Sequence, residues 1–164
     1  MQTSSAVHIF WDNSNIFHGA QHVAEDREGF QARRLVRLHF DHLLTLAAAA
    51  RPVAQAVCVG STAPGLEKAW NRLKAQGIEV ICRERGAQTG TEQGVDETLQ
   101  SAMLRVGYDE PPGVAVLLTG DGAGSKTGRG FTEDLKGLAS LGWGIEVLSW
   151  VDSCHHELRA LAEE

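Results

Sequence analysis

Short apolar runs alternate along the chain with longer segments in which apolar residues recur at helical spacing. The short runs are rich in Val and Ile and almost continuously apolar, which is typical of strands buried on both faces of a sheet. They predict strands at Val7–Trp11, Val53–Gly60, Ile78–Arg83, Val114–Thr119 and Ile145–Trp150. The segments between them predict helices near Ala32–Ala50, Gly65–Gln76, Val95–Val106, Thr132–Leu141 and Ser153–Ala162.

This alternation of strands and helices indicates right-handed crossovers and a parallel sheet. The chain has 164 residues and shows no internal repeat and no linker that would divide it, so we expect one domain over residues 1–164. If the first three strands wind one way and the fourth crosses back, the strand order is 3-2-1-4-5. The prediction is a Rossmann-like α/β/α domain with a parallel sheet of about five strands.

Three acidic residues lie where apolar runs give way to polar loops. Asp12 follows the first predicted strand, Asp121 follows the fourth, and Asp96 opens a helical segment after a glycine-containing loop. In the order 3-2-1-4-5 the first and fourth strands are neighbours, and the helix that contains Asp96 begins at the same edge. Carboxylates gathered there repel one another unless a cation or a proton joins them. They predict a Mg²⁺ or Mn²⁺ site, whose usual substrate is a phosphodiester.

Each acid also has a purely structural interpretation, and these alternatives stay open. A residue within Asp12–Asn15 could cap the next helix, since Asp, Asn and Ser are favoured N-caps. Asp121 and Gly122 fit a plain Asp-Gly turn. Asp96 and Glu97 fit the first turn of a helix, where acids interact favourably with the helix dipole.

The net charge of −6 argues against a protein that binds nucleic acid by bulk electrostatic attraction, so any such contact must be a local basic patch. Candidate phosphate contacts are Lys126 and Arg129 in the loop after Asp121, and Arg83 and Arg85 at the end of the third strand. A further basic cluster consists of Arg33, Arg34 and Arg37. For this cluster a solvated helix face is the favoured interpretation.

The segment Gly120–Thr127 nearly matches a phosphate-binding P-loop and follows a predicted strand. Ser125 stands where the P-loop has the glycine that lets the backbone turn around the β-phosphate. The loop also continues through Gly128 and Gly130 rather than entering a helix. Nucleotide-phosphate binding by this segment is the third-ranked function.

The three cysteines are widely spaced and form no CxxC pair, which favours reduced thiols in a cytoplasmic protein. Cys58 and Cys82 lie in apolar runs and are expected to be core residues. No apolar stretch reaches about 18 residues, so we expect no membrane-spanning helix. No basic region precedes a long apolar run at the N-terminus, so we expect no signal peptide.

The ordered set of motifs resembles the NYN domain, specifically the LabA-like branch of the PIN-like nuclease superfamily. The resemblance covers nearly the whole chain, and the segments that carry it are Phe10–Asn15, Gly94–Asp96, Leu117–Gly122 and Gly142–Val147. It implies a Rossmann-like fold and metal-dependent cleavage of RNA. It also implies that Asp12, Asp96 and Asp121 are catalytic metal ligands for Mg²⁺ or Mn²⁺, and that Asn15 orients the first of them. Supporting roles would fall to Glu97, Thr119, Gly120 and Gly122.

The chain departs from this family at two places. Many relatives read Gly-Asp-x-Asp-Phe after the fourth strand, whereas this chain has Ala123 at the second acid and reaches its phenylalanine only at Phe131. Many also carry a lysine where this chain has Gln93. Glu92, Glu97, Glu133 and Asp134 are the candidates to supply a missing carboxylate. The favoured function is a metal-dependent endoribonuclease, the alternative is a non-catalytic module that binds RNA or a protein, and the prediction leaves room for a homodimer.

Overall fold

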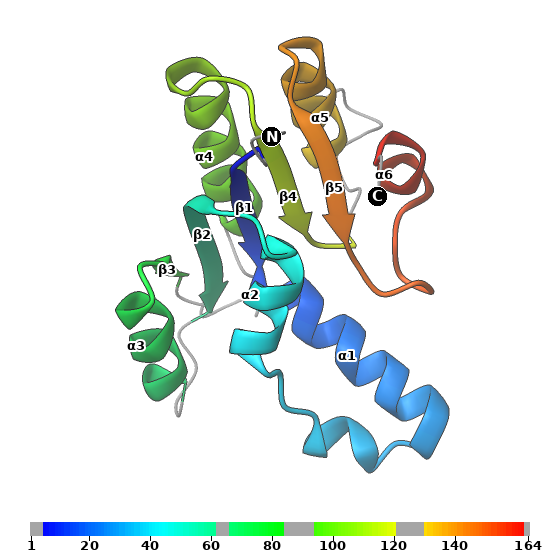
Figure 1. The fold of residues 1–164 in the computed structure, drawn as a ribbon. Coiled ribbons are helices and arrows are strands. Elements are labelled where there is room, and N and C mark those ends of the chain that lie inside the picture. The colour runs from blue at the N-terminus through cyan, green and yellow to red at the C-terminus, as the bar shows by residue number, and fades with distance from the viewer. Residues whose placement is uncertain (1–4, 62–65, 84–93, 121–129, 163–164) are drawn as a thin grey trace.

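The computed structural model describes residues 5–61, 66–83, 94–120 and 130–162, without the side chains of Ser61 and Arg83. Within them a parallel sheet lies between two layers of helices (Figure 1). Its strands are β1 (Val7–Asp12), β2 (Val53–Ser61), β3 (Glu79–Arg83), β4 (Val114–Leu118) and β5 (Gly144–Leu148). The helices are α1 (Asn13–Glu28), η1 (Ala32–Leu35, a 3₁₀ turn), α2 (Phe40–Ala48), α3 (Glu67–Ala75), α4 (Val95–Asp109), α5 (Phe131–Ser140) and α6 (His156–Leu161). None of these helices is long and apolar enough to span a bilayer.

The strand order is β3-β2-β1-β4-β5, and every neighbouring pair is parallel, as the sequence predicted. β1 is the central strand, and all six of its residues are buried. β2 lies on one side of β1 and β4 on the other, so the chain builds the two halves of the sheet outward from this central strand. The switch point of the fold therefore lies between the carboxyl ends of β1 and β4.

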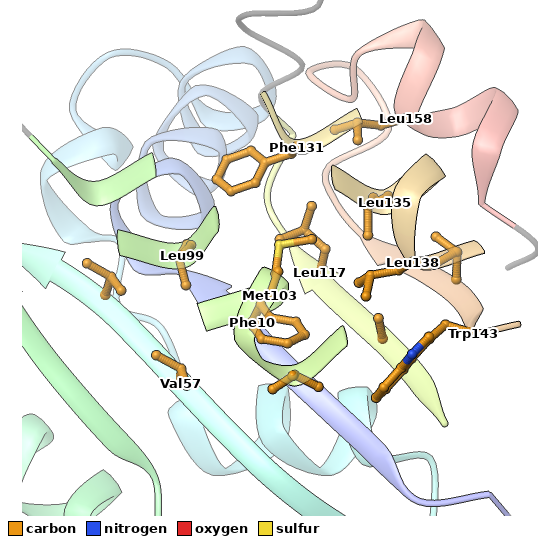
Figure 2. Close-up of a cluster of buried hydrophobic side chains, with 14 of the residues drawn as sticks. Phe10, Val57, Leu99, Met103, Leu117, Phe131, Leu135, Leu138, Trp143 and Leu158 are labelled. Atoms are coloured by element: carbon orange, nitrogen blue, oxygen red, sulfur yellow. The ribbon is translucent and has the colours of Figure 1, made fainter. Parts of the chain in front are cut away.

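The side chains of β1 alternate between two hydrophobic clusters, one on each face of the sheet. Ile9 and Trp11 pack with residues of α1, α2 and α3. Phe10 packs on the other face with residues of α4, α5 and α6. Figure 2 shows this second cluster, in which Phe10 and Leu117 lie close to Met103 of α4. Because both faces are buried, the strands read as continuous apolar runs rather than as alternating patterns.

The helical part of the first crossover differs from the sequence prediction. The predicted helix over Ala32–Ala50 is wrong, because η1 and α2 are separated by an extended segment: Val36 has φ −57° and ψ 133°. α2 begins where the His39 ring accepts a hydrogen bond from the His42 amide, at 3.3 Å. Two leucines that suggested one continuous helix are exposed, Leu35 by 76% and Leu46 by 62%. Their spacing therefore did not reflect a buried face.

The sequence assigned no helix to residues 13–28, yet α1 occupies all of them. Its buried residues are confined to its first half, and three of the four are small or polar, so apolar periodicity is weak: Asn13, Ile16, Gly19 and Ala20. The Nε1 of Trp150 donates to the Ile16 carbonyl at 2.8 Å, and Gly19 lies against the same indole ring. The second half of α1 extends beyond the carboxyl edge of the sheet (Figure 1).

Candidate functional site

Asp12 is the last residue of β1 and the N-cap of α1. Its side chain accepts a hydrogen bond from the Asn15 amide at 3.0 Å, so the structural interpretation of this aspartate as a helix cap is confirmed. Only 5% of Asp12 is exposed. A carboxylate this buried is expensive unless hydrogen bonds or positive charge compensate it, and an N-cap supplies only part of that compensation.

Two further hydrogen bonds of the site come from the residues that follow β4. Thr119, which is fully buried, donates from Oγ1 to the second carboxylate oxygen of Asp12 at 3.3 Å. The amide of Gly120 donates to Oδ1 of Asn15 at 2.7 Å. These bonds join residues more than 100 positions apart and fix the two strand ends relative to each other. We call the group Asp12, Asn15, Thr119 and Gly120 the switch-point network.

Gly120 is held between the switch-point network and the segment that follows β5. Its carbonyl accepts from the His155 amide at 2.9 Å. A Cβ at this position would lie 2.7 Å from the Ser149 hydroxyl and 2.8 Å from the Ser153 carbonyl oxygen. No side chain fits that space, so this position requires glycine.

Asp96 lies in the first turn of α4, after Gly94 in the left-handed conformation (φ 81°, ψ 12°). It is half-buried, and α4 packs against β1 and β2. By the alternation of β1, Asp12 falls on the same face as Phe10, which is the face that α4 covers. Glu97 is exposed and lines an open groove of about 420 Å³ between α4 and strands β2 and β3. The two neighbouring acids therefore face different surroundings.

Several predicted site residues lie outside the described residues. They are Arg85, Asp121, Gly122, Lys126 and Arg129, together with Glu92, Gln93 and Ala123 and most of the near-P-loop. Arg83 is the last residue of β3, where it pairs with Ser61. The structure thus brings Asp12, Asn15, Thr119 and Gly120 together, and the roles predicted for the loop residues stay predictions.

Among the described residues, three buried oxygen atoms lack a hydrogen-bond partner, and only Asp134 of the residues that carry them was a candidate from the sequence. They are Oδ1 of Asn13, Oγ1 of Thr132 and Oδ2 of Asp134. All three belong to the first turns of α1 and α5, which begin at the carboxyl edge of the sheet. Burial raises the pKa of the Asp134 carboxyl, and a hydrogen bond from Gln100 opposes part of that rise. Unsatisfied buried oxygens concentrated at one edge are typical of functional sites, which retain them at a cost in stability.

Cys58 is a buried cysteine near Asp12. It pairs with Trp11 across the β1–β2 ladder and is fully buried. Burial raises the pKa of its thiol well above the usual range, and the negative charge of Asp12 raises it further. A thiol in this state is neither a nucleophile nor a metal ligand. Cys58 is therefore a core residue, as the sequence predicted.

The chemistry of the donor set fits a hard divalent cation, because Mg²⁺ and Mn²⁺ prefer carboxylate and carbonyl oxygens. Asp12 is a buried carboxylate that accepts hydrogen bonds from Asn15 and Thr119, and Oδ1 of the next residue, Asn13, is a buried acceptor without a hydrogen-bond partner among the described residues. Within residues 5–61, 66–83, 94–120 and 130–162, no three His, Cys, Asp or Glu side chains form a group that could hold a metal ion. The predicted set includes Asp121 and so extends beyond those residues.

A parallel sheet in this order, with a buried carboxylate at its switch point, defines an α/β protein whose ligand site lies at the carboxyl edge. The chain belongs to the NYN domain family, whose sequence model matches residues 6–164. It is similar in structure to VPA0982, a Vibrio parahaemolyticus protein of unknown function. That match has a TM-score of 0.68 at 13% identity and covers 99% of this chain and 92% of the other, so it supports the fold alone. No curated protein matches the sequence.

Proposed function

We propose that this protein is a divalent-metal-dependent ribonuclease of the PIN-like superfamily. The observation that supports the proposal most strongly is the switch-point network, in which Asp12 is buried and oriented by Asn15 and Thr119. NYN domains are generally nucleases, and the network lies where such a domain binds its substrate. The resemblance to the LabA-like branch, stated from the motifs, is part of the same proposal.

In this proposal Asp12, Asp96 and Asp121 hold Mg²⁺ or Mn²⁺ at the end of β1, the start of α4 and the turn after β4. A cation bound there supplies positive charge to the scissile phosphate and to the attacking water. Asn15 and Thr119 keep both Asp12 oxygens in fixed directions, and Gly120 sets the position of Asp121. Lys126, Arg129, Arg83 and Arg85 contact phosphates of the RNA without reading its sequence.

The decisive experiment measures cleavage of mixed single-stranded and double-stranded RNA and DNA with Mn²⁺ and with a chelator. We expect cleavage of RNA that requires Mn²⁺ and is abolished by Asp96→Asn. Asp109→Asn is the matched control, because Asp109 is an exposed aspartate at the opposite end of the same helix. Mn²⁺ should also raise the melting temperature, since it binds only the folded state. If Asp12→Asn cuts RNA as fast as the unmodified protein, the proposed chemistry is wrong.

Ala123 favours a second candidate function, a module that binds RNA or a protein without cutting. It stands where many relatives have a second acid. Such a module would bind RNA with the same salt dependence and would show no cleavage with any metal.

Nucleotide binding through Gly120–Thr127 is tested separately by calorimetry with ATP and GTP. Micromolar affinity that is lost in Lys126→Ala would replace the nuclease proposal by this third function.

A further inference from the structure

The part of the molecule that projects beyond the carboxyl edge has a surface of its own. We call residues 21–38 the arm, which comprises the second half of α1, the turn at Gly29, η1 and the extended segment after it. Residues 21–28 include no buried residue, and η1 has none either. η1 packs back on α1 at the far end of the projection (Figure 1). Within the arm, η1 and α1 therefore hold each other, and Leu38 at its end packs against the core.

The arm contains four arginines and three acidic residues, a net charge of +1 in a protein of net charge −6. Residues 29–40 contain three arginines and no acidic residue. Arg33 is paired with Glu25 at 3.2 Å, which neutralises it. Arg34 and Arg37 are exposed, and in the part of the chain that the structure describes neither is paired with a carboxylate. Two positive charges are thus available to an anionic ligand.

These two guanidinium groups are already positioned. Arg37 donates from one nitrogen to the carbonyls of Arg34 and Val36, at 3.2 and 2.7 Å. The guanidinium of Arg34 lies over the ring of Phe30, 5.7 Å from its centroid, and Phe30 itself is 56% exposed. An exposed aromatic ring with adjacent arginines offers a stacking surface for an unpaired base and positive charge for the flanking phosphates.

We infer that the arm binds single-stranded RNA next to the site of cleavage, with a base stacked on Phe30 and phosphates contacted by Arg34 and Arg37. This inference rests on the proposed ribonuclease function and specifies how the substrate is held. α1 carries the arm away from Asp12 over its 16 residues, a length of about 24 Å at ~1.5 Å per residue. A strand bound at both places would therefore extend over several nucleotides. A duplex, whose bases are stacked inside, offers no base to Phe30.

The test compares binding of fluorescent single-stranded and duplex RNA in the presence of chelator, where no cleavage occurs. The variant is Phe30→Ala with Arg34→Ala and Arg37→Ala in the full-length chain. We expect affinity for the single strand to fall about tenfold or more, and the slope of log affinity against log salt to flatten by about 1.4, or ~0.7 for each arginine. Affinity for the duplex should fall less.

The matched control removes two exposed lysines of α3, through Lys68→Ala with Lys74→Ala, and changes the net charge by the same amount. Phe30→Leu, which keeps an apolar side chain of similar size but loses the ring face, should weaken single-strand binding on its own. If the arm variant and the lysine variant lose the same amount of affinity for single-stranded RNA, the loss comes from net charge alone, and the inference is overturned. The inference is also overturned if Phe30→Ala abolishes a dimer seen by sedimentation and leaves RNA affinity unchanged.

Substrate length separates this inference from the proposed function. A trinucleotide can occupy the switch point but cannot reach the arm, whereas a 12-mer can reach both. We expect the arm variant to raise KM about tenfold for the 12-mer and to cleave the trinucleotide at the unmodified rate. If it cleaves both as the unmodified protein does, the arm inference fails and the nuclease proposal stands. If the protein binds through the arm but never cuts, the nuclease proposal fails and the arm inference stands.

Discussion

The two halves of α1 belong to the same helix and have opposite surroundings. The first half contains every buried residue of the helix, begins at the capping carboxylate of Asp12 and is fastened to Trp150. The second half has no buried residue and carries the basic arm. A single helix can therefore position a reactive group at one end and present a binding surface at the other. Changes in the first half should therefore alter chemistry and stability together, and changes in the second half should alter binding alone.

The largest expected effect is at the start of α1. Asp12→Asn and Asp12→Ala should both lower turnover on the order of a hundredfold or more, because several kcal/mol of charge stabilisation depend on this carboxylate. Asn is as good an N-cap as Asp, whereas Ala is not, so only Asp12→Ala should also lower the free energy of unfolding, by about 1 kcal/mol. Cleavage assays and urea unfolding measure the two quantities. An equal loss of stability in both variants would contradict the capping role of the side chain.

The next effect separates the two halves by packing. Gly19→Ala would place a Cβ 2.2 Å from Cδ1 of Trp150, whose ring is fixed by its bond to Ile16. We expect a loss of about 1–3 kcal/mol in the free energy of unfolding, as for other overpacked sites. Glu28→Ala, in the exposed half, should change it by less than about 0.5 kcal/mol. Urea unfolding measures the free energy of unfolding of both variants. If the two variants lose similar amounts, the two halves of α1 do not differ in packing.

A smaller effect concerns the polar groups buried beside the first half. Burial raises the pKa of Asp134 in the folded protein above its unfolded value. Its contribution to stability is therefore fully present below the unfolded pKa and is lost as the pH rises through the folded pKa. Asp134→Asn should then raise the free energy of unfolding at pH 7 and leave it unchanged near pH 3. The free energy of unfolding, measured for Asp134→Asn between pH 3 and pH 7, tests this prediction, and the exposed Asp109→Asn is the control. A stabilisation that does not depend on pH would exclude ionisation of Asp134 as the cause.

The smallest effect lies in the arm. Glu25→Gln breaks the pair with Arg33, whose side chains are 33% and 37% exposed, so the stability cost should stay below about 0.5 kcal/mol. The same change releases a third positive charge on the arm and removes a negative one. RNA affinity at low salt should rise a few-fold, and the salt slope should steepen by about 0.7. Fluorescence anisotropy at several salt concentrations measures both. If this variant binds RNA more weakly than the unmodified protein, the RNA does not bind at the arm.

The same contrast explains how much the sequence could predict. The strands and their order were predictable, because a central strand such as β1 is buried on both faces and leaves a continuous apolar run. α1 was not, because its buried positions include Asn13 and Gly19 and its second half faces solvent, which removes the apolar period. The helix predicted over Ala32–Ala50 was right only for α2, because the chain is extended at Val36 and Leu35 is an exposed leucine that has the spacing of a buried face.

At the candidate site, the sequence could identify groups but not contacts. The acids at the ends of strands 1 and 4 followed from the apolar runs before them, and Thr119, Gly120 and Asn15 followed from the family motifs. The hydrogen bonds from Thr119 to Asp12 and from Gly120 to Asn15 connect residues that only the folded sheet brings together. The unpaired oxygens of Asn13 and Thr132 had no sequence signal, and the sequence could name Asp134 as a candidate but could not show its burial, because burial of a polar atom depends on its neighbours.

The switch-point network also has a consequence for the order in which the chain is made. Asp12 and Asn15 emerge from the ribosome early, but Thr119 and Gly120 follow more than 100 residues later. Until β4 is added, β1 has only β2 beside it, and the carboxylate of Asp12 lacks its bond from Thr119. Domains with such distant pairings fold slowly and only when the last strand arrives. A nascent chain that stops before Gly120 therefore cannot contain the assembled network, so the network forms only after β4 has been synthesised.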